Sequence, residues 1–301
     1  DDDEVLIGIA VDNVGNLYVG GSTGSDLGGT LEGVNTIDPF VAKLSSISGI
    51  LDNSYGDGDG IDNDGIVQLN TLPSSNSSNF KINAMALDSI TMDIFLAGSL
   101  RGSYGGANSN SPQWDVFVAK FNALADGALD TSFGDGDGVA NDGVVQLNAG
   151  NLSDTDSSEL ARSLTLDGVG NIFLAGSTYS ALGGAHAGAG DIFVVKMDTT
   201  DGVLDASFGD GDGTDNDGVV QVNIASASSQ DTPSVLVFNG GILHIAGYTE
   251  GPLGGASTSR DGYVLKMDAT SGLLSTVFGD GDGADNDGIL QVNTLNAGTD
   301  S

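Results

Sequence analysis

The chain has 301 residues, of which 42 are acidic and 8 are basic, and its formal net charge of -34 argues against binding to nucleic acid or anionic lipid. Its 48 glycines, 5 prolines and zero cysteines exclude collagen, a proline-rich linker and a disulfide-stapled scaffold. No apolar run reaches the roughly 18 residues of a membrane-spanning segment, so we expect no membrane insertion.

The sequence repeats itself in four copies, and each copy begins with two short apolar segments joined by a tight turn. In the first copy these segments are residues 8–12 and 16–20, separated by the pair Gly15-Asn16. The third copy repeats the pattern around Gly170-Asn171. Such pairs suit a β-hairpin, since its turn needs residues that tolerate positive φ. We therefore predict two antiparallel strands at the start of each copy.

A third segment of the pattern Asp-x-Phe-Val-x-Lys, with Tyr263 in place of the phenylalanine in the fourth copy, follows the hairpin. It recurs at spacings of 77, 76 and 70, at residues 38–43, 115–120, 191–196 and 261–266. Its final position is a lysine in every copy: Lys43, Lys120, Lys196 and Lys266. In so acidic a chain we expect these lysines to pair with nearby aspartates rather than to form a ligand-binding ring.

An acidic cassette and a last apolar segment complete each copy. The cassettes are residues 57–65, 135–143, 210–218 and 280–288, and they hold four, three, four and four aspartates. An aromatic residue, Tyr55, Phe133, Phe208 or Phe278, precedes each cassette and is expected in the core. The last segment contains a glutamine, Gln68, Gln146, Gln221 or Gln291, which we place on the outward face of a fourth strand.

Four short strands per copy, with glycine and aspartate turns and no sustained 3.6-residue period, predict an all-β fold. The Asp, Gly-Asn, aromatic and Gly-x-Thr elements, together with Asp-x-Phe-Val-x-Lys, resemble the bacterial extracellular β-propeller repeats called SBBP repeats. In the first copy they are Asp12, Gly15, Asn16, Tyr18, Gly21 and Thr23, followed by residues 38–43. The second copy departs from the pattern, with Met92-Asp93 at the turn and Leu100 in place of the threonine, and the fourth has Gly240-Gly241.

This resemblance implies a β-propeller-like array of four four-stranded antiparallel blades. The blades are predicted at residues 1–70, 71–148, 149–223 and 224–301. The step from the last strand back to the first is close in length to the internal linkers. The array is therefore a closed four-blade propeller, half of a larger propeller shared with neighbouring copies, or a window of a longer repeat array. The start at Asp1, without a methionine or a signal-peptide pattern, is read as that of a mature or excised piece.

The cassettes predict calcium binding. Carboxylates about 5 Å apart repel by roughly 3 kcal/mol at an effective dielectric near 20, and the cassettes contain no lysine or arginine. Calcium accepts six to eight oxygen ligands, and Asp-x-Asp-Gly turns supply alternate side chains and a carbonyl. We expect up to four Ca²⁺ ions, one per copy, with magnesium and an ion-free acidic turn as alternatives. The expected ligands are Asp57, Asp59, Ile61, Asn63, Asp64; Asp135, Asp137, Val139, Asn141, Asp142; Asp210, Asp212, Thr214, Asn216, Asp217; Asp280, Asp282, Ala284, Asn286 and Asp287.

The cassettes resemble the Asp-x-Asp-Gly calcium loops of thrombospondin type 3 and integrin propeller repeats. They do not match an EF-hand, because the twelfth position, which requires a bidentate glutamate, is Gln68 in the first copy and glutamine in the others. Ala140 replaces the third aspartate of the second cassette. The corresponding aspartates of the other copies are therefore not expected to bind the ion.

The sequence predicts a calcium-stabilised structural or adhesive module of a prokaryotic surface, matrix or filament protein, located outside the cell. Self-association with further copies is the expected partnership. A glycan-binding propeller is the alternative, with Trp114, Tyr104 and Tyr179 as candidate contacts and surface glycans as partners. A propeller enzyme such as a lyase or hydrolase is the third and least favoured alternative. Because the two histidines, His186 and His244, do not recur at equivalent places and form no acid-base group, the chain is predicted not to be an enzyme.

Overall fold

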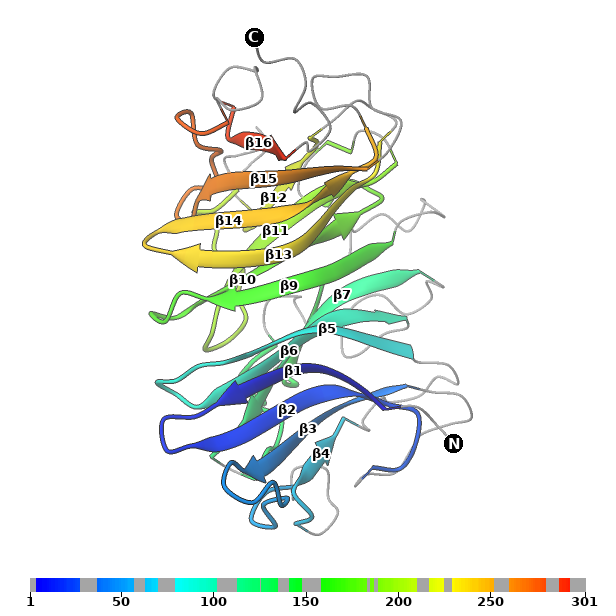
Figure 1. Cartoon of the computed structure of the whole chain (residues 1–301), viewed down its shortest axis with the longest axis vertical. Coiled ribbons are helices and arrows are strands. Elements are labelled where there is room, and N and C mark those ends of the chain that lie inside the picture. Colours follow the sequence, from blue (N-terminus) through cyan, green and yellow to red (C-terminus); the bar gives the residue numbers. More distant parts are fainter. Residues whose placement is uncertain are drawn as a thin grey trace. The chain divides into compact units, whose positions relative to one another are not determined.

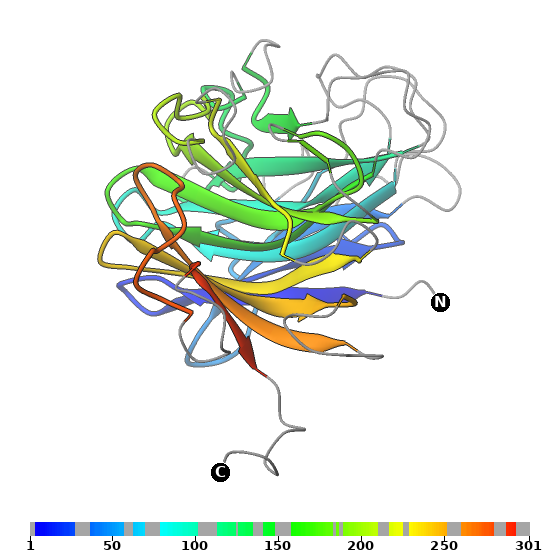
Figure 2. The ribbon, with the colours of Figure 1, turned by 90° about the horizontal axis from the view of Figure 1, so that it is seen from above.

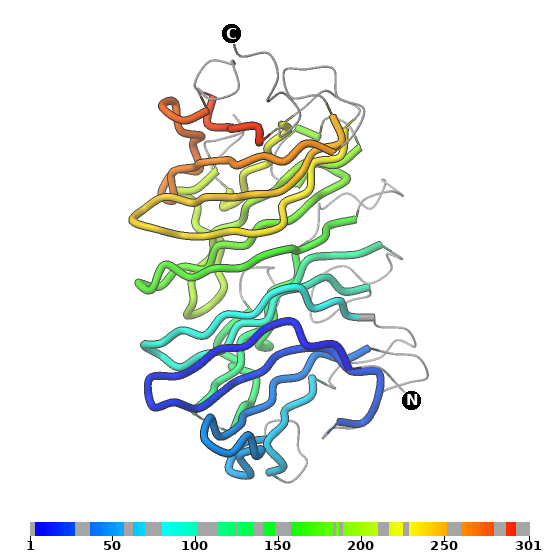
Figure 3. The backbone as a smooth tube through the Cα atoms, viewed as in Figure 1, coloured from blue at the N-terminus to red at the C-terminus, as the bar shows by residue number. Residues whose placement is uncertain are grey.

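The computed structural model describes residues 4–27, 37–56, 63–69, 79–101, 113–124, 126–134, 141–147, 158–182, 185–186, 189–209, 217–224, 229–251, 260–279 and 287–292. Within these ranges the regular elements are all strands, and they form four four-stranded antiparallel sheets, each a meander of consecutive strands (Figures 1 and 3). The predicted all-β fold with four four-stranded blades is confirmed. The described ranges contain no helix long and apolar enough to cross a membrane.

The four sheets repeat one strand pattern. The first contains β1 (Val5–Val11), β2 (Asn16–Thr23), β3 (Asp38–Ser45) and β4 (Ile66–Gln68), and the second contains β5 (Asn79–Leu87), β6 (Asp93–Arg101), β7 (Trp114–Asn122) and β8 (Val144–Leu147). The third contains β9 (Glu159–Leu166), β10 (Asn171–Thr178), β11 (Asp191–Asp198) and β12 (Val219–Val222), and the fourth contains β13 (Asp231–Asn239), β14 (Ile242–Thr249), β15 (Asp261–Asp268) and β16 (Ile289–Val292). In Figure 2 the strands of the fourth sheet, yellow to red, fan out with the twist usual for β-sheets.

The chain folds as two compact units. Unit 1 contains residues 1–148 with the short segments 168–171 and 198–203, and unit 2 contains 149–167, 172–197 and 204–301. In unit 1, Tyr18, Val41 and Tyr55 of the first sheet share one buried cluster with residues of the second, including Ile94 and Phe117. In unit 2, the third and fourth sheets share a cluster around Phe173, Phe208 and Ile245. Each core thus lies between two successive sheets.

The hairpin at the start of the first copy is fixed by an aspartate side chain. Oδ1 of Asp12 accepts hydrogen bonds from the backbone N–H groups of Val14 and Asn16, at 3.0 and 2.8 Å. Gly15 in this turn has φ of 94°, a conformation that glycine adopts without strain. In the second copy Met92 takes φ of 66°, so a residue with a side chain occupies a left-handed conformation there.

Candidate functional site

A hydrogen bond between the two ends of the loop closes the base of each acidic cassette. The N–H of Gly65, which ends the first cassette, donates to the carbonyl of Tyr55 at 2.8 Å. The same bond recurs at 2.8 to 2.9 Å in the other copies, joining Gly143 to Phe133, Gly218 to Phe208 and Gly288 to Phe278. All four cassettes are therefore held at both ends.

The last aspartate of each cassette caps the strand that follows. Oδ1 of Asp64 accepts a hydrogen bond from the N–H of Ile66 at 2.8 Å, and Asp142, Asp217 and Asp287 make the same contact in their copies at 2.9 to 3.0 Å. This carboxylate also lies against the glycine that directly precedes the cassette, since a Cβ on Gly56 would be 2.8 Å from Oδ1 of Asp64. One carboxylate oxygen thus has a structural role in every copy.

Most of the residues predicted to bind calcium lie outside the described residues. The structure places Asn63, Asp64, Asn141, Asp142, Asp217 and Asp287, all at the closing end of their loops. Among the described residues no three His, Asp or Glu side chains gather as metal ligands. The other expected ligands lie outside the described ranges: Asp57, Asp59, Ile61, Asp135, Asp137, Val139, Asp210, Asp212, Thr214, Asn216, Asp280, Asp282, Ala284 and Asn286.

Three of the four aromatic residues before the cassettes attach the loops to the core, as predicted, whereas Phe278 is half-buried. Tyr55, Phe133 and Phe208 are buried. Each makes an edge-to-face contact with an aromatic residue of the second strand of its own sheet, with ring centroids 5.9 to 6.1 Å apart. The base of the loop is therefore anchored in the hydrophobic core.

The expected lysine–aspartate pairs form in three of the four sheets. Nζ of Lys43 lies 3.0 Å from Asp52, and Nζ of Lys196 lies 2.5 Å from Asp205. Lys120 contacts two carboxylates, Asp130 at 2.8 Å and Asp93 at 3.2 Å. In the fourth sheet Ser275 replaces the aspartate, and Lys266 lies over the Phe278 ring at 5.8 Å instead.

These pairs lower the pKa values of their aspartates. Burial is the largest influence on the pKa of Asp205 and raises it, but hydrogen bonds from Lys196 and Ser207 outweigh burial and lower the pKa to about 2. Hydrogen bonds from Ser54, followed by the contact with Lys43, lower the pKa of Asp52 to about 2 as well. Because both values lie below the ordinary 3.8, the pairs stabilise the fold above about pH 4, and this stabilisation is lost as the pH falls toward 2.

The glutamines of the last strands do not lie on an outward face, and that prediction is wrong for three of the four. Gln68, Gln146 and Gln221 are only 1, 5 and 6 % exposed. Nε2 of Gln221 donates to Asp191 at 2.7 Å and to the carbonyl of Ser180 at 3.0 Å. The glutamines are buried because the aspartate that begins the third strand, and a loop backbone, satisfy the amide.

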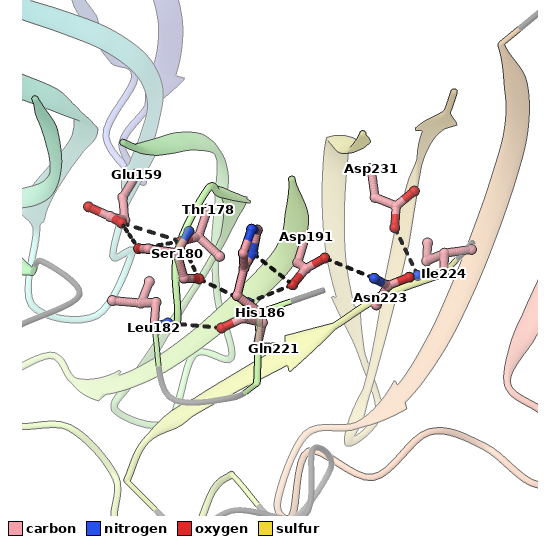
Figure 4. Close-up of polar contacts among 10 residues, drawn as sticks. All are labelled: Glu159, Thr178, Ser180, Leu182, His186, Asp191, Gln221, Asn223, Ile224 and Asp231. Atoms are coloured by element: carbon pink, nitrogen blue, oxygen red, sulfur yellow. Dashed lines mark hydrogen bonds and ion pairs between the residues drawn. The ribbon is translucent and has the colours of Figure 1, made fainter. Parts of the chain in front are cut away.

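Figure 4 shows that this contact belongs to a buried polar network in unit 2. Asp191 also accepts from Asn223 at 3.1 Å and lies 3.3 Å from Nδ1 of His186. Nearby, Oε1 of Glu159 accepts from Thr178 at 3.3 Å and from Ser180 at 2.8 Å. The side chains of Glu159 and Asp191 are fully buried.

Sequence reasoning missed this network, although its members recur at fixed places in the copies. In the first sheet Glu4 accepts from Thr23 and Ser25 at 3.2 and 2.8 Å. The second sheet replaces both partners together, because Phe80 faces Leu100 where the third sheet pairs Glu159 with Thr178. Exchanging both members of a buried polar pair for apolar groups leaves no unsatisfied atom, which explains the departure of Leu100 from the repeat pattern.

Of the three candidate glycan contacts, the structure describes Trp114 and Tyr179, and each has protein partners. Tyr104 lies outside the described ranges. The Trp114 ring is covered by two cations, with Nζ of Lys81 at 4.1 Å and Cζ of Arg101 at 4.6 Å from its centroid. Tyr179 accepts a hydrogen bond from Gln230. These contacts do not favour a sugar-binding platform.

Among comparisons with known proteins, a match to a family model supports the propeller-like architecture. A family model described as a β-propeller repeat (SBBP) matches residues 7–28, which contain β2 and most of β1. No curated protein matches the sequence. Solved structures that the chain resembles include a luciferin-regenerating enzyme, at 12 % identity over 81 % of this chain and 53 % of that one, with a TM-score of 0.34.

Two further solved structures are among the matches. A GH43_12 protein from a capybara gut metagenome shares 9 % identity over 88 % of this chain and 41 % of its own length, with a TM-score of 0.36. The α-L-arabinofuranosidase arb93a from Fusarium graminearum shares 9 % identity over 91 % of this chain and 71 % of its own, with a TM-score of 0.37. The chain spans about half the length of the first two structures.

The prediction that the chain is not an enzyme is contradicted by these matches, whose names are those of enzymes, and we do not maintain it. Its basis was that the two histidines form no acid-base group, yet His186 lies 3.3 Å from Asp191, a contact without a counterpart in the other described sheets. At these identities and TM-scores no reaction or substrate is transferred to this chain. The repeat match and the four four-stranded sheets together give a β-propeller repeat protein of propeller-like fold.

Proposed function

We propose that this chain is a calcium-stabilised structural or adhesive module of an extracellular surface, matrix or filament protein of a prokaryote. The observation that supports it most is the closed base of the cassettes. In every copy a backbone hydrogen bond joins the loop ends, and the last aspartate is fixed against the first strand residue after the loop. The same loop is thus anchored in the same way four times.

Because the ends of each cassette are held together, its aspartates repel one another, and a bound cation would offset this repulsion. The first loop has four aspartates in nine residues and no basic residue, and its ends cannot separate to relieve repulsion while the Gly65–Tyr55 bond is formed. Calcium suits such a loop because it accepts many oxygen ligands in irregular geometry. We propose Asp57, Asp59, the carbonyl of Ile61, and Asn63 or Asp64 as ligands in the first copy, with the corresponding residues in the others.

The donor set of the described residues fits this proposal. Oδ1 of Asp64 is engaged by the N–H of Ile66, and the other oxygen of the same carboxylate is of the type and charge that a hard cation prefers. Extracellular calcium modules work at dissociation constants of roughly 10⁻⁴ to 10⁻³ M, which matches a location outside the cell. Surface, matrix and filament proteins are built from such repeated units, and we propose that further copies of this chain are its partners.

Removing two aspartates from the second cassette is expected to abolish calcium binding there. This loop has three aspartates where each of the others has four, so Asp135→Asn with Asp137→Asn leaves it the least negative charge. The matched change in the third copy, Asp210→Asn with Asp212→Asn, retains Asp215 and Asp217 and is expected to weaken its site less. Calcium titration by calorimetry on both double variants measures the difference. Equal losses would show that the extra aspartate does not contribute, and unchanged binding in both would contradict the proposed ligands.

A further inference from the structure

Successive sheets of the chain are joined by one repeated backbone contact. The N–H of the glycine that directly precedes a cassette donates to a carbonyl in the turn after the third strand of the next sheet. Gly56 donates to Asp126 at 3.1 Å within unit 1. The contact recurs at 2.9 Å from Gly134 to Asp201, also in unit 1, and at 3.2 Å from Gly209 to Ser271 in unit 2.

A glycine next to each acceptor packs closely on the aromatic residue and the last strand of the preceding sheet. A Cβ on Gly127 would lie 2.5 Å from the Tyr55 ring and 2.4 Å from Val67. The same close approach is made by Gly202 on Val145 and Phe133 and by Gly272 on Val220 and Phe208, with nearest distances of 2.5 and 2.4 Å. The donor glycine, the aromatic residue and the valine form one half of an interlock, and the carbonyl and its neighbouring glycine form the other.

The fourth sheet carries the first half of this interlock on a face that the described residues leave partly uncovered. Among the described residues no carbonyl accepts from the N–H of Gly279. Phe278 is half-buried, whereas its counterparts in the other sheets are at most 1 % exposed, and Val292 is 51 % exposed where Leu69 of the first sheet is 4 % exposed. We define this tail face by His244, Val264, Phe278, Leu290 and Val292.

The first sheet carries the second half. A Cβ on Gly49 would meet no described atom within 4 Å, although this glycine corresponds to Gly127, Gly202 and Gly272. Ile9 and Val11 of β1 are 68 and 58 % exposed, whereas the residues at the same register in the second sheet, Met85 and Leu87, pack against the core of unit 1. We define this head face by Ile9, Val11, Leu17, Val19 and Gly49.

We infer that the tail face of one chain binds the head face of a second copy of the same chain, continuing the interlock that already joins successive sheets. The residues that define the two faces are counterparts of residues that pack together in the internal contacts, and none of them is acidic. A head-to-tail contact of this kind leaves a free face at each end of the assembly, to which a further copy can bind. This inference rests on the proposed structural role and names the surface through which it operates.

Cysteine cross-linking tests the contact, because the chain contains no cysteine of its own. The internal geometry places the position of Gly49 beside that of Leu290, as Gly127 lies beside Val67. Mixing the single variants Gly49→Cys and Leu290→Cys under mild oxidation is expected to give a disulfide-linked dimer. The control pair Ile90→Cys and Leu290→Cys, which uses an exposed turn residue of unit 1, is expected to remain monomeric.

Sedimentation velocity over a concentration series measures the strength of the same contact. Ile9→Glu places a charge in the head face and is expected to raise the dissociation constant about 10- to 100-fold, the effect of losing one buried isoleucine contact. Ile90→Glu makes the same change at another exposed isoleucine and is expected to leave the constant unchanged. A single-species monomer at all concentrations, or equal effects of both variants, would overturn the inference.

Two further results separate this inference from the calcium proposal. A double variant carrying Gly49→Cys and Leu290→Cys that forms only an intrachain disulfide would show that the tail binds its own head, and the second copy would be the wrong occupant. Repeating the cross-linking in EGTA and in calcium distinguishes the two proposals. A cross-linked dimer in both conditions, with an unchanged melting curve, would support the head-to-tail contact and contradict calcium stabilisation. Calcium-dependent stability without any cross-link would support calcium stabilisation and contradict the contact.

Discussion

Removing calcium with EGTA is expected to lower the melting temperature of this protein by about 10 °C. An ion that binds only the folded loop adds about 1.4 kcal/mol per site at ten times its dissociation constant. Each unit contains two cassettes, so each loses about 3 kcal/mol. For units of roughly 150 residues, 1 kcal/mol corresponds to about 2 to 4 °C.

Differential scanning calorimetry in calcium, in EGTA and in EGTA refilled with excess calcium measures this effect. Refilling is expected to restore the curve, and an equal concentration of magnesium is expected to restore less, because magnesium requires tighter octahedral geometry. A melting curve that is the same in all four conditions would contradict calcium stabilisation. Full recovery with magnesium alone would instead favour magnesium as the ion that the loops bind.

Lys120→Met is expected to destabilise unit 1 by about 3 to 5 kcal/mol, because it leaves two acids without their partner. The side chains of Lys120 and Asp93 are 6 and 10 % exposed, and that of Asp130 is 22 % exposed. Burial lowers the pKa of Lys120, but Asp130 and Asp93 outweigh it and raise the pKa, which keeps the lysine charged. Urea unfolding of the variant and the wild type at pH 7 measures the loss.

Lys266→Met provides the matched control for this substitution. Lys266 occupies the same register position, but Ser275 replaces the aspartate there, so its loss leaves no paired carboxylate behind. We expect a cost below about 1 kcal/mol, the usual limit for an exposed charge contact. Equal losses in the two variants would show that the methylene stem of the lysine, not its charge, stabilises the sheet.

The pH dependence of the Lys120→Met variant follows from its aspartate. Burial raises the pKa of Asp130, but hydrogen bonds from Lys120 and Ser132 outweigh burial and lower the pKa in the native protein. The stability that this carboxylate contributes is therefore present above its ordinary value of 3.8 and is lost as the pH falls. The gap between variant and wild type is expected to narrow below about pH 4.

Local patterns in the sequence predicted the sheets because each strand is bounded by residues with a definite backbone role. Gly15 and Gly170 adopt the positive φ that their hairpins require, and the apolar positions between turns alternate between two buried faces. The lysine–aspartate pairs were also predictable, since Lys43 and Lys196 are cations in an otherwise acidic repeat. These features depend on contacts close in sequence or at a fixed repeat offset.

The glutamines and the interlocking glycines were not predictable in the same way. Strand periodicity predicts on which face of its strand the Gln221 side chain lies. Its burial, however, depends on Asp191, about 30 residues away, and on the backbone of Ser180. Gly127 reads as an ordinary turn glycine, and its contact with Tyr55 appears only when two sheets are packed together. The cassette ligands themselves lie largely outside the described residues, so the calcium site stays a prediction.

The number of calcium ions bound per chain tests the central claim most directly. Equilibrium dialysis of metal-depleted protein against buffered calcium, followed by atomic emission analysis, gives this number without reference to stability or assembly. Each of the four cassettes has the same closed base and the same fixed aspartate. We therefore predict about four ions per chain at saturation and about three in the variant carrying Asp135→Asn and Asp137→Asn. Binding of no calcium at millimolar concentration, or an equal number in the variant, would contradict calcium binding by the cassettes.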